Sequence, residues 1–549
     1  MNLAPNRLFV AALRKIKQKL KQVKNSSYIR KLDSLKLGVP PNPEKKILKI
    51  LYGPSFSIWS PSFALDRSIA YALEGQNSEI FPIYCDGIQE TDCNCIGGLW
   101  GGGTSFQKNC MKCEQSSRTL WRSYGQKAIK LSRYLTDDDK NQISRIVSHL
   151  DIDELLSFTE DGLPIGKLAK DILVNNFLVA SLEMVPNARV LLQTHVSNLL
   201  RLKVSYSRII DSIKPDRVIS NDSYYGMWAV MEYLCKERSI PFYSYWPCTK
   251  ERAAFAYNDA SMNLDFREAW PHFSRIDLTP KDKVKINTWL DGDRALTIDT
   301  TKPSAENLYD ERAEFIDHGK PSILLAANVI WDLAALNKQI VFSDMMSWIN
   351  ETIAWFKNHP DFQLVIKPHP AESTPSIPLT RERVEDCVLE LESLLPKNVI
   401  ILKSSTHLTL NDLIRDYNIK AFVVHTTTPG YEFAARGYKT ITTARAPYRG
   451  YGFTFDPVTK QDYFELVLNC LRSTERKLPQ HQIDLAQKFL KLYQFHYYVN
   501  HNLFSGFPPQ INEALPETAR NKNSAFGYII AKIIAGKPIV SQFCWPPES

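Results

Sequence analysis

Short apolar runs alternate with longer amphipathic stretches along most of the chain. This alternation predicts buried strands between helices, which is typical of parallel sheets covered by helices on both faces. The predicted strands are residues 47–52, 79–85, 216–220, 241–245, 322–330, 362–366, 399–402, 421–424 and 439–442. Because 549 residues are too many for one ordinary core, we predict an α/β protein with two Rossmann-like domains that face a cleft.

The strands fall into two groups, which suggests how the chain is divided. We predict a basic arm and linker over residues 1–46, a first Rossmann-like domain with helical and Cys-rich insertions over 47–260, a connection over 261–320, a second Rossmann-like domain over 321–500 and a tail over 501–549. The connection has no clear periodicity, and its Asp291-Gly292-Asp293 favours a solvated turn over a metal–nucleotide site. The apolar helix Ala525–Ala535 in the tail is expected to cross back and brace the first domain.

The stretch between residues 421 and 457 carries the strongest candidate binding site. The strand Ala421–Val424 ends in His425 and Thr426–Thr428, and Pro429-Gly430 then opens a short helix that Gly437 can end. Unpaired backbone N–H groups at a helix N-terminus, with threonine hydroxyls beside them, favour a phosphate. An ordinary strand–helix unit with a threonine cap is the competing interpretation.

Polar side chains near this turn and at other predicted strand ends are candidates for the same pocket. Lys367 and His369 follow the strand 362–366, where two prolines hold the chain extended, and this pair suits a diphosphate. A structural histidine is the alternative. Glu432, one turn into the helix, is placed to hold a ribose. The remaining candidates are Asn328 and Asp332 after the strand 322–330, Ser404 after the strand 399–402, and Arg445, Tyr448 and Arg449 beyond the strand 439–442.

Four of these stretches, taken in order, resemble a known family. They are residues 328–332 (NVIWD), 366–372 (IKPHPAE), 425–437 (HTTTPGYEFAARG) and 446–457 (APYRGYGFTFDP). Their order and spacing resemble the bacterial capsule polysaccharide biosynthesis family, glycosyltransferases of the GT-B type that include Kdo-transferring capsule and lipopolysaccharide enzymes. The resemblance covers residues 320–470 well and 48–260 loosely. The threonine triplet, where a serine is expected, and Tyr431, where a smaller or apolar residue is usual, depart from it.

The resemblance implies metal-independent transfer of a sugar from a nucleotide-sugar donor to a growing, lipid-linked surface or capsular polysaccharide. The expected donor-binding residues are Asn328, Asp332, Lys367, His369, Ser404, His425, Thr426, Thr427, Thr428, Gly430, Glu432, Arg445 and Tyr448. His369 is also expected to act in catalysis. Asp222, at the end of the strand 216–220, is the candidate base for the acceptor hydroxyl, with a helix N-cap as its alternative role.

Five of the ten cysteines lie between Cys85 and Cys113. Cys110-x-x-Cys113 has the spacing of a metal-ligand pair, and Cys93-x-Cys95 is a poorer first pair. We therefore predict a structural zinc site at Cys93, Cys95, Cys110 and Cys113, with free thiols in a loop near the acceptor cleft as the alternative. No cofactor is expected to be required for catalysis.

The positive charge is concentrated at the N-terminus. Residues 1–36 hold ten Lys and Arg and one acid, a charge of +9, whereas the whole chain carries +8. The remaining residues therefore carry about −1. Phe9, Leu13, Ile16, Leu20 and Val23 share one helical face among the basic residues. Such a helix favours an anionic membrane surface, here through residues 7–31, over a helix packed on the body or a solvated tail. The chain shows no apolar run long enough to span a membrane and no secretory signal. We expect a cytoplasmic, membrane-peripheral protein that binds no nucleic acid.

Three other functions are compatible with parts of this pattern. Transferases that use CDP-glycerol or CDP-ribitol resemble this chain in the Lys-Pro-His-Pro stretch. Sugar-nucleotide epimerases share the expected fold, but should lack the basic arm and the long first domain. A catalytically idle scaffold of a glycan-synthesis complex would bind nucleotide without turnover.

Overall fold

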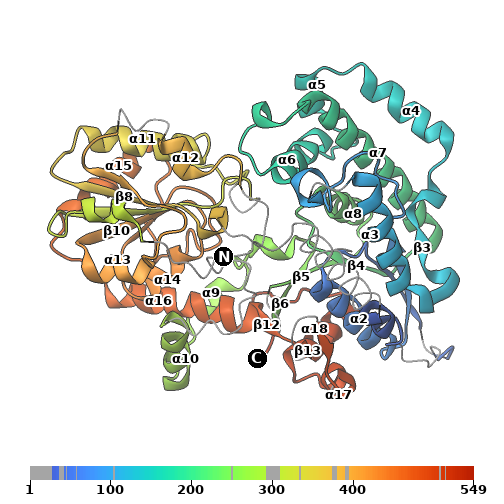
Figure 1. Ribbon diagram of the computed structural model, residues 1–549. Helices are drawn as coiled ribbons and strands as arrows, with labels where there is room; N and C mark the ends of the chain where they lie inside the picture. Colours follow the sequence, from blue (N-terminus) through green and yellow to red (C-terminus); the bar gives the residue numbers. More distant parts are fainter. Residues whose placement is uncertain are drawn as a thin grey trace, which may run out of the picture.

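The structure is a computed structural model. It describes residues 27–35, 42–44, 46–56, 59–102, 105–248, 252–291, 309–332, 336–373, 380–389, 395–501, 503–505, 509–513 and 515–548. Two α/β units, each built on its own sheet, stand side by side (Figure 1). The predicted fold class, two Rossmann-like domains, is confirmed. The residues that carry the predicted amphipathic face of the arm lie outside the described part.

The first unit contains a seven-stranded sheet in the order β12-β6-β5-β4-β1-β2-β3. Its strands are β1 (Leu48–Tyr52), β2 (Ser78–Tyr84), β3 (Ile129–Lys130), β4 (Arg217–Asn221), β5 (Phe242–Pro247), β6 (Arg252–Tyr257) and β12 (Val499–Asn500). β1 to β5 are parallel, whereas β6 runs antiparallel to β5 and β12 antiparallel to β6. The sequence pattern predicts neither β6 nor the two-residue strands at the sheet edges, because distant partners decide whether such segments pair.

Helices cover both faces of this sheet. They are α2 (Ser60–Glu74), α3 (Phe106–Leu120), α4 (Asp137–Ser148), α5 (Ile152–Ser157), α6 (Ile165–Phe177), α7 (Ala188–Ile213) and α8 (Gly226–Glu237). The predicted helices 165–182 and 189–213 correspond to α6 and α7. α6 ends early because Leu178 takes a left-handed conformation with φ of 57°. α6, α7 and α8 enclose one hydrophobic core, and α2 encloses a second on the other face.

The second unit contains a five-stranded parallel sheet in the order β11-β10-β7-β8-β9. Its strands are β7 (Ser322–Ala326), β8 (Gln363–Lys367), β9 (Val399–Ile401), β10 (Ile419–Val424) and β11 (Thr440–Thr442). Its helices are α11 (Met345–Lys357), α12 (Val384–Leu389), α13 (Leu410–Asp416), α14 (Pro429–Ala435) and α15 (Lys460–Arg472). The middle residues of β7, β8 and β10 are apolar, as expected of strands covered by helices on both faces. β7 is shorter than the predicted strand and ends at Ala326.

The segment between the sheets is more ordered than its sequence suggests. It contains α9 (Trp270–Phe273) and α10 (Pro280–Leu290), and α10 begins with a capping box between Thr279 and Asp282. α9 and α10 pack with α14 and with α16 (Gln480–Lys491) around one aromatic cluster. This segment therefore holds helices where the sequence shows no clear periodicity, and the packing of neighbouring helices fixes them.

The tail returns to the first unit, as expected. After the hairpin of β13 (Phe504–Ser505) and β14 (Gln510–Ile511), α17 (Leu515–Arg520) and α18 (Ala525–Ala535) pack against α2. In Figure 1 these red helices lie beside the blue α2. The tail thus completes the hydrophobic core on that face of the first sheet.

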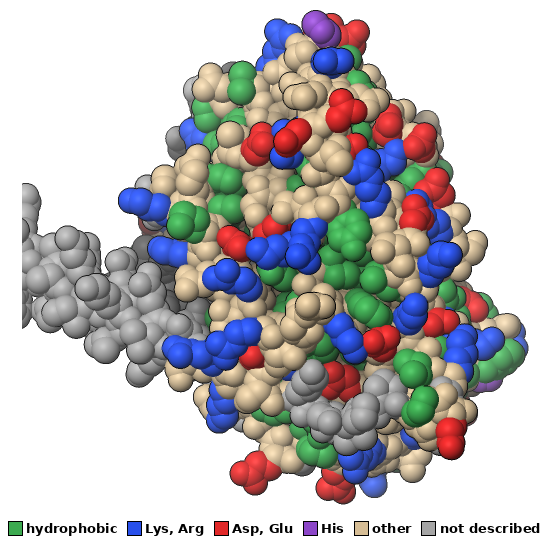
Figure 2. All heavy atoms as spheres, turned by 90° about the vertical axis from the view of Figure 1, so that its right-hand side faces the viewer, with side chains coloured by type: hydrophobic (Ala, Val, Ile, Leu, Met, Phe, Trp, Pro, Cys, Tyr) green, Lys and Arg blue, Asp and Glu red, His purple; other side chains and the backbone are tan. Residues whose placement is uncertain are grey.

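Two surface features bear on the predicted partners. Residues 27–33 are helical, and Tyr28, Ile29 and Leu32 are buried against the first unit, so this end of the basic segment packs on the body. On the face shown in Figure 2, basic and acidic side chains are interspersed. Among the described helices, none is both long and apolar enough to cross a membrane.

Candidate active site

A cavity of about 610 Å³ lies between the two units. The carboxyl ends of β4 and β5 border it on one side, and the turn after β10 borders it on the other. Ligands of open α/β sheets bind at this edge. A second, more polar cavity of about 910 Å³ continues from it and shares the side chains of Tyr224, Lys338 and Arg445. Both walls therefore contribute to one continuous cleft.

Asp222, directly after β4, is the acidic side chain of the first unit that lines the first cavity, whereas Asp171 and Asp259 line the second. Its carboxylate accepts hydrogen bonds from Ser261 Oγ (3.2 Å) and from the Met262 N–H (3.4 Å). Burial raises the pKa of Asp222 to about 7, which suits a base that works near neutral pH. The alternative role does not apply, because Tyr225 is the N-cap of α8 and no side chain caps that helix.

The turn after β10 presents Thr426 and Thr428 to the cavity, as the sequence predicts. Asn328 holds this turn from below: its amide donates to Thr426 Oγ1 (3.0 Å) and accepts from the Thr426 N–H (3.1 Å). Asn328 thus positions the turn and does not line the cavity. Asp332, by contrast, is on the wall.

Two cations line the junction of the two cavities. Arg445, which the sequence singles out, donates from Nη2 to the Asn337 carbonyl (2.6 Å). Lys338 Nζ lies 3.5 Å from Asn263 Oδ1 and 5.3 Å from the centre of the Tyr224 ring. Burial lowers the pKa of Lys338, and the Arg445 charge lowers it further. Within the described chain neither cation is in an ion pair with a carboxylate, so together they favour an anionic ligand. Lys338 lies in a segment without a motif, and no sequence signal marks it.

Three of the predicted donor residues, at the ends of β8 and β9, do not line either cavity. Lys367 is buried at the end of β8, where burial lowers its pKa to about 8. Burial and the Lys367 charge lower the pKa of His369 to about 4, and His369 Nδ1 accepts from the Ala371 N–H (3.1 Å). Ser404 hydrogen-bonds to Ser373. A shared sheet edge therefore does not bring these strand ends to the threonine turn, and the roles of Lys367, His369 and Ser404 stay predictions.

Other predicted residues in and around the turn contact it or its neighbours inside the second unit. The buried His425 ring stacks on Trp348 at a centroid distance of 6.0 Å. Tyr448 lines the cavity, and its hydroxyl donates to the Thr427 carbonyl (2.7 Å). Gly430 is required here, because a Cβ would lie 2.1 Å from the Tyr448 hydroxyl oxygen. Glu432 is buried in α14 and is not on the cavity wall, so its predicted contact with a ribose stays a prediction.

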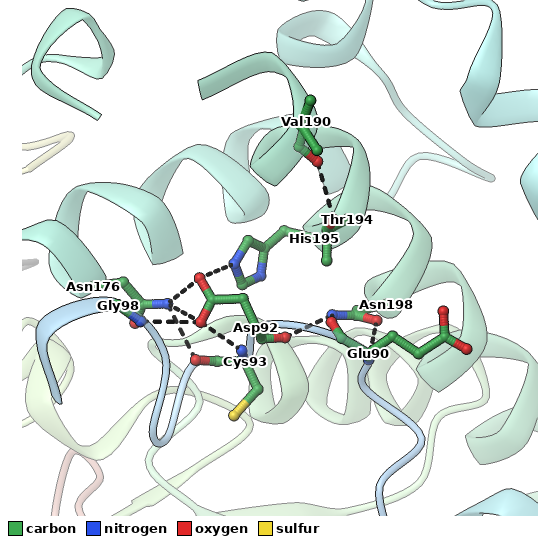
Figure 3. A network of polar contacts seen from close by, with 9 residues as sticks. All are labelled: Glu90, Asp92, Cys93, Gly98, Asn176, Val190, Thr194, His195 and Asn198. Carbon is green, nitrogen blue, oxygen red and sulfur yellow. Dashed lines mark hydrogen bonds and ion pairs between the residues drawn. The ribbon is translucent and has the colours of Figure 1, made fainter. Parts of the chain in front are cut away.

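A buried polar network fixes the loop that closes the first-unit wall (Figure 3). The Asp92 carboxylate accepts from the N–H groups of Cys93 (3.0 Å) and Gly98 (3.1 Å) and from Asn176 Nδ2 (3.3 Å). His195 Nε2 lies 3.3 Å from its other oxygen. Sequence reasoning missed this network, since its members come from three separate segments.

The same loop carries Trp100 to the second unit. Its indole N–H donates to the Asn175 carbonyl (3.1 Å), and its ring packs edge-on against Trp331 at 6.0 Å. Trp100 and Trp331 both line the cavity. The loop therefore connects the two walls.

The five clustered cysteines meet at a separate small cavity of about 20 Å³. Cys93 and Cys95 hydrogen-bond to each other, which holds the pKa of Cys93 below its usual range. None of the five is in a disulfide. Within the described ranges, no three His, Cys, Asp or Glu side chains form a group that could hold a metal ion. The spacing thus correctly predicts that Cys93, Cys95, Cys110 and Cys113 are neighbours, but the structure does not arrange them as a metal site. Bound zinc stays a prediction that metal analysis of the purified protein tests.

Comparison with known proteins found similarity in structure only. No protein-family model matches the sequence, and no curated protein matches it significantly. A solved structure of Thermosulfurimonas dismutans KpsC, described as a beta Kdo 2,4 transferase, is 13% identical, covering 56% of this chain and 87% of its own, with a TM-score of 0.31. The Methanocaldococcus jannaschii UDP-GlcNAc 2-epimerase in complex with UDP-GlcNAc and UDP is 13% identical over 82% of this chain and 99% of its own, with a TM-score of 0.25. Sucrose-phosphate synthase from Thermosynechococcus elongatus is 9% identical over 81% and 96%, with a TM-score of 0.29.

Proposed function

We propose that this protein is a glycosyltransferase that moves a sugar from a nucleotide-sugar donor to an acceptor hydroxyl in the cleft. One observation carries the proposal: a single cavity holds a buried acid with a pKa near 7 on one wall and threonine hydroxyls with two cations on the other. Sugar transfer needs this combination, a base for the acceptor and a site for the leaving phosphate.

The acceptor oxygen attacks the anomeric carbon of the donor and forms the new glycosidic bond. The bond between that carbon and the phosphate oxygen breaks, and the nucleotide leaves with the electron pair. The acceptor proton passes to the Asp222 carboxylate, which is ready to accept it when ionised. The sugar is thus transferred without a change in oxidation state, and protonated Asp222 then releases its proton to solvent.

The second wall stabilises the leaving nucleotide. Thr426 and Thr428 offer hydroxyl donors, and Lys338 and Arg445 offer positive charge. Because Asn328 and Tyr448 fix the turn in advance, little reorganisation is needed as charge develops on the phosphate oxygen. Removing one such electrostatic contact is expected to raise the barrier by about 2.7–4 kcal/mol.

The biological setting follows from the sequence resemblance and is part of the proposal. The acceptor is a growing surface or capsular polysaccharide, probed first in lipid-linked form. The reaction takes place at the cytoplasmic face of the membrane, to which the basic segment 7–31 attaches the enzyme. A flotation assay with vesicles of anionic and of neutral lipid, on the full chain and on a chain lacking residues 1–26, tests this attachment.

The nucleotide is the first quantity to measure. Thermal unfolding with CMP, CDP, UDP, GDP and ADP should show stabilisation by one class, and a tenfold excess over Kd adds about 1.4 kcal/mol to the free energy of unfolding. We expect the shift to shrink in Lys338→Met. Lys320→Met is the matched control, since Lys320 precedes β7 at the opposite end of the sheet and donates to the Pro360 carbonyl.

The outcomes separate the competing functions. Stabilisation by one nucleotide, with transfer of sugar from its nucleotide sugar, supports the proposal. Release of CMP with polyol phosphate transferred to the acceptor would show a CDP-polyol phosphotransferase, and nucleotide binding without any turnover would show a scaffold. If no nucleotide stabilises the protein, the proposed donor site is wrong.

A further inference from the structure

Four aromatic rings form a continuous surface on the first-unit wall of the cleft. Phe56 follows β1, Trp59 precedes α2, Trp228 lies in α8 and Trp246 lies in β5. The ring centroids are 5.5 Å apart for Phe56 and Trp228, 5.8 Å for Phe56 and Trp246, and 5.4 Å for Trp59 and Trp246. All four side chains line the cavity. Segments that are far apart in the sequence thus build one apolar platform.

One ring of the platform is fixed in the protein interior, and the other three are partly exposed. Trp228 is 1% exposed, and its indole N–H donates to the Pro54 carbonyl (2.8 Å). Phe56, Trp59 and Trp246 are half-buried, so part of each ring remains available to a ligand. A surface whose base is already fixed binds without a large loss of side-chain entropy.

The sheet register places one acid beside this platform. β4 and β5 are parallel neighbours, and Asn221 is paired with Tyr245. Trp246 is the next residue of β5 and Asp222 is the first residue after β4, so the two lie at the same level of neighbouring strands. Both line the cavity. The result is an apolar face with a carboxylate at its edge.

We propose that this wall is the acceptor subsite and that it binds a pyranose ring, with Trp246 and Trp59 against the C–H face of the sugar and Asp222 at a hydroxyl on its rim. A pyranose has this dual character: its C–H groups form an apolar face and its hydroxyls surround the edge. Aromatic side chains match such a face because they are flat, large and weakly polar. Calling the bound sugar the acceptor depends on the proposed transfer reaction. The proposal that the platform binds a carbohydrate does not depend on it.

A nucleotide base is the competing occupant, and the charges argue against it. The groups suited to the phosphates, Thr426, Thr428, Lys338 and Arg445, come from the other unit, which supplies its own rings next to the threonine turn, Tyr431 and Tyr448. Tyr431 and Tyr448 are each 1% exposed and offer little ring surface, but the phosphates hold the nucleotide to this wall, so its base is expected on the same side. The first-unit platform then remains for the second substrate.

The test measures sugar and nucleotide binding on the same full-length proteins. The probes are the methyl α- and β-glycosides of glucose, galactose, mannose and N-acetylglucosamine, titrated by calorimetry and by saturation-transfer NMR. The variants are Trp246→Ala, Trp246→Phe and Trp59→Ala. Trp355→Ala is the matched control, because Trp355 is half-buried on α11, stacks on His359 and lies outside the cavity.

We expect at least one glycoside to bind, with about tenfold weaker binding in Trp246→Ala and in Trp59→Ala. Trp246→Phe should recover part of the loss, since it keeps a flat ring, and Trp355→Ala should change nothing. Nucleotide stabilisation should be the same in all four variants. In a transfer assay the KM for the acceptor should rise while the KM for the donor stays constant.

Other results overturn the inference. It is wrong if no glycoside binds to the wild type, if Trp246→Phe and Trp246→Ala bind the glycoside as tightly as wild type, or if they lose nucleotide affinity, which would assign the platform to the base. Trp246→Phe and Trp59→Ala keep the test valid if Trp246→Ala does not fold. Glycoside binding without any nucleotide binding would refute the transferase proposal while leaving a carbohydrate platform, so the two failures are distinguishable.

Discussion

Both walls of the cleft are formed at the carboxyl edge of a parallel sheet, but one wall is mainly apolar and the other is polar and positively charged. In the first cavity, the first-unit wall is largely aromatic and includes one acid, Asp222. The second-unit wall ends in threonine hydroxyls and is joined by Lys338 and Arg445. The apolar wall recognises shape and, by burying Asp222, raises its pKa to about 7; the polar wall recognises charge. The difference teaches that the fold supplies the place, whereas the residues after each strand decide which substrate is held there.

The largest expected effect comes from removing the acid of the apolar wall. Asp222→Asn keeps the shape of the side chain and cannot accept the acceptor proton, so the rate of transfer should fall by about 10²–10⁴. Nucleotide stabilisation should persist, because the donor groups lie on the other wall. Asp259→Asn, which alters a neighbouring acid that lines only the second cavity, should leave the rate within a few-fold of wild type. Equal losses in both variants would remove Asp222 from its proposed role.

The same carboxyl should make stability depend on pH. Its folded pKa of about 7 lies above the ordinary value near 3.9, so the folded state binds the proton more tightly than the unfolded state. The contribution of Asp222 to the free energy of unfolding is therefore fully present below pH 4 and is lost as the pH rises to about 7. The Asp222→Asn variant has no carboxyl to ionise at this position and so avoids this loss of stability. Its free energy of unfolding should exceed that of the wild type by a few kcal/mol at pH 8, and by less at pH 5.

Urea unfolding of both proteins at the two pH values measures this difference. A difference that does not change between pH 5 and pH 8 would show that Asp222 is ionised throughout and not in an apolar setting. The rate of the wild-type reaction should likewise rise with pH through about 7, as the base loses its proton.

The sequence predicts the second unit better than the first wall. Strand 421–424, its threonine turn and the helix after Pro429 could be identified because each has a local cause: an apolar β-branched run, hydroxyl caps and a proline at a helix start. The aromatic platform could not, because its four rings come from three separate segments and meet only through the pairing of β1, β4 and β5. Lys338 is also missing from the prediction, because its segment carries no motif.

Correct local reasoning also misplaced side chains within the second unit. Lys367 ends β8 and His369 follows it, but β7 separates β8 from β10, so the two residues lie at a different point of the edge. Glu432 lies one turn into α14 as expected, and the helix turns it away from the cavity wall. Periodicity shows which strand a residue follows, whereas strand order decides which residues meet.

A smaller effect is expected from the cations of the polar wall. Hydrogen bonds to charged groups contribute about 1.5–3 kcal/mol, so Lys338→Met or Arg445→Met should weaken nucleotide binding about tenfold to a hundredfold. Lys338→Arg should retain most of the affinity, because the charge is kept. Calorimetric titration at low and high salt measures both the loss and its screening. Unchanged affinity in both methionine variants would leave the threonine turn as the sole anion site and weaken the contrast between the walls.

The smallest effect concerns the contact that joins the two walls. Trp100 packs edge-on against Trp331, and such pairs contribute about 0.5–1.5 kcal/mol beyond their buried area. Trp331 also donates to Thr380 Oγ1 (2.8 Å), so a single variant would mix two losses. A double-mutant cycle of Trp100→Phe and Trp331→Phe, read by urea unfolding, isolates the pair itself. A coupling energy within that range means that the two walls meet in solution before the donor binds. If the effects of the two substitutions simply add, the two units stand apart in the free protein. Binding of the donor would then have to close the cleft. A coupling energy that appears only when nucleotide is present would show this.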